Sequence, residues 1–327
     1  MKKEEFFAAL AAGLSAMSEQ ERAGVLEYYE EIICDEVEHG VSEEDVLADL
    51  GDPVELARRV MEEAENLART GERPQEPEER VFSAVQPVRE LVVRAENVRV
   101  QVERVSDGPV RVRFTPVRGE KVSVVEENGV FTFRHTMSGM RLFSLGLSEL
   151  FKEPRCVLVQ LPPDFTGTLS VTTSNARVEG EDLGSMGDAE FVTSNARVVL
   201  SGLQCGALRV KTTNGSLELY SARGSTCIMS TNNAKVTVED ALFPVRMELY
   251  TGNGTISVAR SGSDDLRFTT SNASIRAALI GDGRTYSIRS RTSNGKNNLP
   301  PDWPCPGSEK RLEVTTSNAK IDVTFSL

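Results

Sequence analysis

The stretch Thr173-Ser174-Asn175-Ala176 is the first copy of a motif that recurs along the second half of this 327-residue chain. Its asparagine appears eight times, and successive copies are 20, 19, 19, 20, 19, 22 and 24 residues apart. A threonine always stands two residues before the asparagine, and Ala or Gly always follows it. The eight pairs of this Thr-x-Asn motif are Thr173 and Asn175, Thr193 and Asn195, Thr212 and Asn214, Thr231 and Asn233, Thr251 and Asn253, Thr270 and Asn272, Thr292 and Asn294, and Thr316 and Asn318. A fixed period of this length indicates stacked structural repeats.

Apolar residues flank the motif in seven copies, as Val171 and Val178 do in the first. The seventh copy differs, with Ser290 and Asn297 at these two positions. The alternation on each side of the motif predicts two short strands with one buried face, and the change of parity at the asparagine predicts a bend. Asparagine suits a bend because it tolerates the left-handed conformation and can hydrogen-bond to its own backbone.

Two architectures fit this pattern. A hairpin in each repeat would place the asparagine and its neighbour in a two-residue turn, but such turns favour Gly at the second position. Five copies have Ala there, which is unfavourable at positive φ. A β-solenoid, with neighbouring coils about 4.8 Å apart, would instead stack each asparagine on the next. We favour the β-solenoid and expect the Thr and Asn ladders to be structural, because ladders satisfy buried backbone groups.

The sequence therefore predicts a mainly β protein with a small N-terminal helical bundle. We expect residues 1–70 to form the bundle, residues 71–80 a flexible linker, and residues 81–327 a β-repeat domain. Within the last, residues 81–160 read as an irregular β entry section, and residues 161–327 as a β-solenoid of about eight repeats of about 20 residues.

Three sequence runs identify the helical part. They are Tyr28-Tyr29-Glu30-Glu31-Ile32, Gly40-Val41-Ser42-Glu43-Glu44-Asp45-Val46 and Leu50-Gly51-Asp52-Pro53. Together they resemble the HAAS signalling domain of bacterial proteins over residues 1–65. The resemblance implies a protein–protein interaction module in a regulatory circuit, whose partner would be a regulatory or a membrane protein.

The β part also resembles a known family. The strand that leads into Leu161-Pro162 and the Thr-Ser-Asn-Ala phrase are similar to the bacterial β-repeat family named "putative adhesin", over residues 90–327. That resemblance implies an all-β repeat fold without established catalysis. The apolar segment 136–152 interrupts the pattern, and we expect it to cover the open end of the solenoid, with an exposed docking element as the alternative.

Charge is distributed unevenly along the chain. The net charge is -12, and residues 1–80 hold 8 Lys or Arg against 23 Asp or Glu, which gives -15 for this part alone. An acidic chain argues against general nucleic-acid binding. The five cysteines are odd in number and lack zinc-site spacing, which fits a reducing compartment. Because neither a signal peptide nor a membrane span is recognisable, we expect a cytoplasmic protein, or one peripheral to the membrane.

Candidate catalytic groups are sparse. The only histidines, His39 and His135, lie in different segments, and acid pairs such as Glu181-Asp182 and Asp264-Asp265 do not recur at a common position of the repeat. We therefore predict no catalytic residue, no cofactor and no metal site.

A basic stripe is the one candidate interaction site. Two residues after the asparagine, five copies carry a cation, and these are Arg177, Arg197, Lys235, Lys296 and Lys320. The stripe is expected either to be a solvated face or to dock an acidic partner.

The function predicted from the sequence is a non-enzymatic scaffold for protein–protein interaction. One alternative is a self-assembling structural or adhesin-like protein, in which terminal strands near Val323-Thr324-Phe325 pair with another copy. A second alternative is a carbohydrate-active β-helix enzyme.

Overall fold

The coordinates are a computed structural model that describes residues 2–19, 22–23, 25–26, 29–30, 33, 42–70, 78–116, 120–137 and 155–326. The chain divides into a helical unit within Met1–Glu78 and a β unit made of Glu79–Met137 and Cys156–Leu327. The predicted segment 136–152 lies outside the described residues from position 138 onward, and so do residues 71–77 of the predicted linker 71–80.

The helical unit contains α1 (Lys3–Gly13), α3 (Glu43–Leu50) and α4 (Pro53–Thr70). The Ser42 hydroxyl caps α3 by accepting a hydrogen bond from the Asp45 N–H at 3.1 Å, and Asp52 caps α4 by accepting from the Val54 N–H at 2.9 Å. Much of the predicted bundle between residues 20 and 41 falls outside the described residues.

The core of this unit is apolar and closely packed. Its buried side chains are Phe6, Leu10, Leu14, Val25, Ile33, Val46, Leu47, Leu56, Ala57 and Val60. A Cβ on Gly13 would lie 2.4 Å from the Ala57 Cβ, so glycine is what allows the end of α1 to approach α4 so closely. None of the described helices combines the length and the apolarity that crossing a bilayer requires.

In the described part of the β unit, 22 strands form one hydrogen-bonded sheet that winds around itself. Before the repeats come β1 (Arg80–Ser83), β2 (Glu90–Ala95), β3 (Arg99–Arg104), β4 (Arg111–Phe114), β5 (Glu120–Glu127), β6 (Val130–Met137) and β7 (Cys156–Leu161). The repeats comprise β8 (Thr168–Thr173), β9 (Val178–Glu181), β10 (Gly184–Ser185), β11 (Ala189–Val192), β12 (Val198–Lys211), β13 (Leu217–Ser230), β14 (Val236–Glu239), β15 (Arg246–Tyr250), β16 (Ile256–Ser261), β17 (Asp265–Thr269), β18 (Ile275–Ile280), β19 (Ser287–Arg291), β20 (Asp302–Trp303), β21 (Arg311–Thr315) and β22 (Ile321–Ser326), with the short 3₁₀ helix η1 (Gly283–Thr285) before β19.

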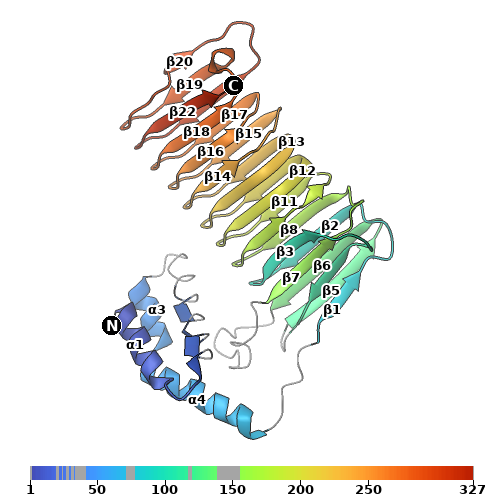
Figure 1. Cartoon of the computed structure of the whole chain (residues 1–327), viewed down its shortest axis with the longest axis vertical. Helices are drawn as coiled ribbons and strands as arrows, with labels where there is room; N and C mark the ends of the chain where they lie inside the picture. The colour runs from blue at the N-terminus through green and yellow to red at the C-terminus, as the bar shows by residue number, and fades with distance from the viewer. Residues whose placement is uncertain are drawn as a thin grey trace. The chain divides into compact units, whose positions relative to one another are not determined.

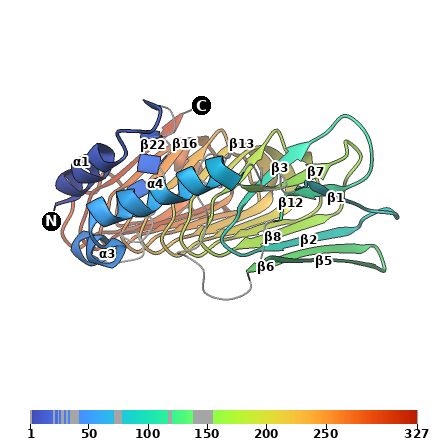
Figure 2. The ribbon, with the colours of Figure 1, turned by 90° about the horizontal axis from the view of Figure 1, so that it is seen from below.

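Successive repeats pair in parallel and in register, which excludes a hairpin in each repeat. Val171, Phe191 and Val210 are neighbours on adjacent coils, and the same register continues to Met229 and Leu249. Figure 1 shows these strands as rungs of one stack. Figure 2, turned by 90°, shows the layer of β2, β6 and β8 apart from the layer of β3 and β7. The predicted solenoid-like architecture is therefore confirmed.

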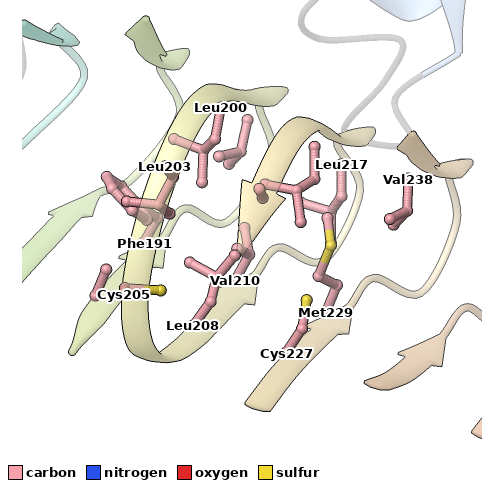
Figure 3. Close-up of a cluster of buried hydrophobic side chains, with 14 of the residues drawn as sticks. Phe191, Leu200, Leu203, Cys205, Leu208, Val210, Leu217, Cys227, Met229 and Val238 are labelled. Carbon is pink, nitrogen blue, oxygen red and sulfur yellow. The ribbon is translucent and has the colours of Figure 1, made fainter. Parts of the chain in front are cut away.

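A continuous apolar column fills the interior of the stack. Alternate residues of each strand point inward, and those of consecutive coils lie over one another. Figure 3 shows part of this column, labelled at Phe191, Leu200, Leu203, Cys205, Leu208, Val210, Leu217, Cys227, Met229 and Val238. Because neighbouring coils share the column, each coil depends on the next for burial of its apolar face.

The order of coils in space differs from their order in the sequence. β21 lies between β17 and β19, so the last copy of the motif stacks directly on the sixth, and the seventh lies outside it. At the other end, β2 lies between β8 and β6, and β3 lies between β9 and β7. The expectation that each copy stacks on the next in sequence is thus wrong at the seventh copy. Its polar Ser290 and Asn297 suit an outer cover rather than a central coil.

Positive φ occurs at a corner that the sequence did not reveal. None of the eight repeat asparagines has positive φ, so the expected left-handed asparagine is wrong for the repeats. In five copies a left-handed residue lies instead seven positions after the asparagine, and these residues are Asp182 (48°), Gly202 (62°), Ser221 (51°), Asp240 (55°) and Arg260 (47°). The residue types at this second corner vary, so no single residue marks it in the sequence.

The coil order can be checked with engineered disulfides. Thr269 and Thr315 are register partners on neighbouring strands, whereas β21 separates Thr269 from Arg291. Cysteines at 269 and 315 should oxidise to a disulfide, because their Cα atoms are about 5 Å apart. Cysteines at 269 and 291 should not, because two strand spacings place them about 10 Å apart. Mass spectrometry of the oxidised proteins measures both, and the opposite result would restore the sequential order.

Candidate functional site

The repeat asparagines form a chain of side-chain hydrogen bonds along one corner of the solenoid. Each Nδ2 donates to the Oδ1 of the asparagine on the neighbouring coil, over 2.5 to 2.8 Å. In the direction of donation the order is Asn294, Asn318, Asn272, Asn253, Asn233, Asn214, Asn195, Asn175 and Asn97. Asn97 was missed in the sequence because Ala95 replaces the threonine of the motif.

The threonines lie inside the same corner and bond to the backbone rather than to one another. In seven of the eight copies the Thr hydroxyl donates to the carbonyl of the Ala or Gly that follows the asparagine on the neighbouring coil. Thr231, for example, donates to the Gly215 carbonyl at 3.0 Å and is 1% exposed. Thr173 does the same to the Val98 carbonyl. The hydroxyls therefore satisfy carbonyls buried between coils.

Where the residue after the asparagine is glycine, the neighbouring coil leaves no room even for a Cβ. A Cβ on Gly215 or on Gly254 would lie 1.8 Å from the carbonyl oxygen of Ala196 or Ala234 on the coil below. No side chain larger than Ala occurs at this position in any copy of the motif. All sixteen ladder residues thus act on the packing of one coil against the next.

The basic stripe is interleaved with carboxylates. Arg177 pairs with Glu179 at 3.1 Å, and Lys320 pairs with Asp322 at 2.5 Å. Lys296 has no ion pair among the described residues. On successive coils the stripe positions read Arg177, Arg197, Ser216, Lys235, Thr255, Ser274, Lys320 and Lys296. The stripe is therefore two short basic groups and one separate lysine, rather than a continuous basic face.

Glu218 is the buried counter-ion at the centre of the stripe. Its carboxylate is 6% exposed and lies 3.5 Å from the Arg197 guanidinium and 3.3 Å from the Lys235 ammonium. The Tyr220 hydroxyl donates to it at 3.0 Å. Burial, together with the negative Glu218, raises the pKa of Tyr220. Arg197 and Lys235, which lie two coils apart, are thus both paired with one carboxylate on the coil between them.

The groups that could support catalysis lie apart from one another. His39 is outside the described residues, and His135 is buried beside Glu120, with Nε2 3.2 Å from Oε1. Asp264 pairs with Lys310, and Asp265 pairs with Arg267 on its own strand. Among the described residues, no three or more His, Cys, Asp or Glu side chains gather as metal ligands would.

The surface depressions and the thiols offer no better candidate. Two shallow depressions share Gln204 and Arg223, and no Asp or Glu among the described residues lines either one. Burial raises the pKa of Cys205 to about 12 and also raises that of Cys227, so neither thiol is activated as a nucleophile.

Comparison with known proteins gives two family matches. A model described as HAAS matches residues 5–59, and a model described as Toastrack DUF4097 matches residues 88–324. No curated protein matches the chain significantly.

Three solved structures are similar to this chain. One, described as a "putative cell adhesion protein" from Clostridium sporogenes ATCC 15579, is 10% identical over 76% of this chain and 100% of its own, with a TM-score of 0.23. A "putative adhesin" from Bacteroides fragilis NCTC 9343 is 12% identical over 76% of this chain and 94% of its own, with a TM-score of 0.35. Another "putative adhesin", from Parabacteroides merdae ATCC 43184, is 9% identical over 78% of this chain and 98% of its own, with a TM-score of 0.33.

The role of the buried threonines can be measured by one methyl-for-hydroxyl exchange. Thr231→Val keeps the shape of the side chain but leaves the Gly215 carbonyl without its donor. We expect a loss of about 1–3 kcal/mol in the free energy of unfolding, measured by urea denaturation. Thr213→Val, at an exposed position one residue before Asn214, is the matched control and should change stability little. Equal effects of the two variants would contradict this role.

The pairing of Glu218 can be tested by removing its cations. Arg197→Gln with Lys235→Gln leaves a buried carboxylate without a positive charge nearby, and we expect it to lower the free energy of unfolding by about 1–3 kcal/mol. Adding Glu218→Gln removes the buried charge and should recover part of this loss. A triple variant no more stable than the double variant in the same denaturation experiment would show that the two cations do not act through Glu218.

Proposed function

The chain belongs to the family of Toastrack DUF4097 proteins, and we propose that it acts as a non-enzymatic scaffold for protein–protein interaction. In this proposal the HAAS domain at residues 5–59 is the signalling module, and the β-solenoid of about eight repeats is a rigid platform. The setting we propose is bacterial regulatory or envelope-stress signalling, with a regulatory or a membrane protein as the partner.

The observation that carries the proposal is the uninterrupted asparagine ladder. Eight hydrogen bonds tie nine coils to their neighbours at one corner. Outward-facing side chains on successive coils are therefore held in fixed positions relative to one another. A surface that is already ordered binds with a smaller loss of conformational entropy than a flexible one. This favours a function in presenting side chains to a partner.

Two groups of cations are the binding positions that we propose. Arg177 and Arg197 lie on neighbouring coils at one end of the stripe, and Lys320 and Lys296 lie on neighbouring coils at the other. Their exposed heads can contact carboxylates of an acidic partner, and the counter-ions of Arg177, Arg197 and Lys320 keep those three side chains ordered. Carbohydrate cleavage is not part of the proposal, since Asp264 and Asp265 are engaged with cations.

The proposal is tested by affinity capture from the native cell with the full chain as bait. A scaffold should enrich one defined protein, and the variant Arg177→Gln with Arg197→Gln, which leaves Lys235 beside Glu218, should reduce its recovery by at least about tenfold, because both positive charges that would face the partner are removed. The matched control, Arg289→Gln with Arg291→Gln, makes the same change in charge on another face and should retain the partner. Equal recovery with both variants would exclude these arginines as the site, and the absence of any specific partner would count against the scaffold function.

A further inference from the structure

The two edges of β22 are held very differently. Its inner edge pairs with β18 along six residues, from Ile321 with Ile275 to Ser326 with Ile280. Its outer edge meets the covering segment, residues 296–299, at a single bridge between Asn297 and Ile321. There the Ile321 N–H donates to the Lys296 carbonyl at 2.8 Å, and the Asn298 N–H donates to the Ile321 carbonyl at 3.3 Å.

The Asn298 side chain closes the next position on this outer edge. Its Oδ1 accepts the Val323 N–H at 2.9 Å, and its Nδ2 donates to the Val323 carbonyl at 2.8 Å. One residue of a neighbouring antiparallel strand makes this same pair of bonds with the residue opposite it. The amide of Asn298 therefore takes the place of one residue of a missing strand.

The other contacts of the covering segment are mainly polar, and they include a longer bond of 3.4 Å from the Asn298 Nδ2 to the Asp322 Oδ1. Ser290 and Asn297, which hydrogen-bond to each other at 2.8 Å, stand where the regular repeats bury apolar side chains. Leu299 packs only partly buried against the core. A segment with few buried apolar contacts and few backbone bonds opens locally at much lower free energy than the coils beneath it.

We propose that the outer edge of β22 is a docking site for β22 of a second copy of this chain, and that residues 296–299 hold it closed. The two strands would run antiparallel about a two-fold axis at Val323, the position that Asn298 now occupies. Such a pairing sets Ile321 opposite Phe325 and Asp322 opposite Thr324, so no like charges meet and the apolar residues share one face. This inference concerns self-association and does not depend on the proposed scaffold function.

The experiment compares dimerisation of the full chain and its variants by analytical ultracentrifugation over a range of concentrations. Asn298→Ala removes both hydrogen bonds to Val323, which stabilise the closed state. The variant should therefore dimerise at least about tenfold more tightly than the unchanged chain. Circular dichroism controls for retention of the β fold. An Asn298→Ala variant that is folded and no more dimeric than the unchanged chain would overturn the proposal.

Two substitutions of opposite charge at position 324 test the strand register of the proposed dimer separately. Thr324 is exposed, and both replacements lose the same long hydrogen bond of 3.4 Å from its hydroxyl to the Ala277 carbonyl, so the two variants can be compared directly. In the proposed dimer, Thr324→Lys places a cation opposite Asp322, and Thr324→Asp places a second anion there, at two symmetry-related positions. The Lys variant should dimerise about tenfold more tightly than the Asp variant, in the Asn298→Ala background or in the unchanged chain. Equal dimerisation of the two would overturn the proposed register.

Discussion

The structure depends on how each coil satisfies the hydrogen bonds of its backbone at the corner that carries the Thr-x-Asn motif. Strand hydrogen bonds stop where the chain bends, so the carbonyl after each asparagine needs another donor, and the interior of the stack offers no water. The threonine of the neighbouring coil supplies that donor from a position that is almost fully buried. The asparagine supplies the matching bond on the outer side of the same corner. Because both residues act on the coil next to them, their spacing is fixed by the length of one coil.

A solenoid has a second constraint at its two ends, where an uncovered coil would expose strand edges to other chains. Both ends meet it in the same way. At the N-terminal end, the coil of β2 and β3 lies directly on the regular array, and β6 and β7, which come later in the chain, cover it. At the C-terminal end, the coil of β21 and β22 lies directly on the array, and β19, which comes earlier in the chain, covers it. At the C-terminal end the cover imitates a repeat, since β19 pairs in parallel with β21 and Asn294 continues the ladder. Val323, which the sequence suggested as an open pairing site, already has its N–H and carbonyl bonded to Asn298.

The sequence predicted those features that are set within one repeat. The position of the bend, the inward face of each strand and the ladder of asparagines follow from local periodicity and from the capacity of an amide to donate and accept. The order of the coils could not be predicted, because Asn294 and Asn318 present the same ladder to either neighbour. The second corner was missed because residues as different as Asp182 and Arg260 occupy it at positive φ. Glu218 was overlooked as a partner of the stripe because its cations come from the coils on either side.

The division between fixed and free positions is what links this fold to its proposed function. Inward residues and both ladder residues are committed to packing one coil on the next, so they leave little freedom for a ligand. Outward residues are not constrained in this way, and they differ from coil to coil, as Val199, Thr237 and Arg276 do at one position of the second layer. Electrostatic pairing across coils, as between Arg209 and Glu190, then orders these variable side chains without neutralising the surface as a whole. In the proposed function, recognition would arise from combinations of outward side chains on several coils, and a change in the stacking order would alter the surface even if no outward residue were replaced.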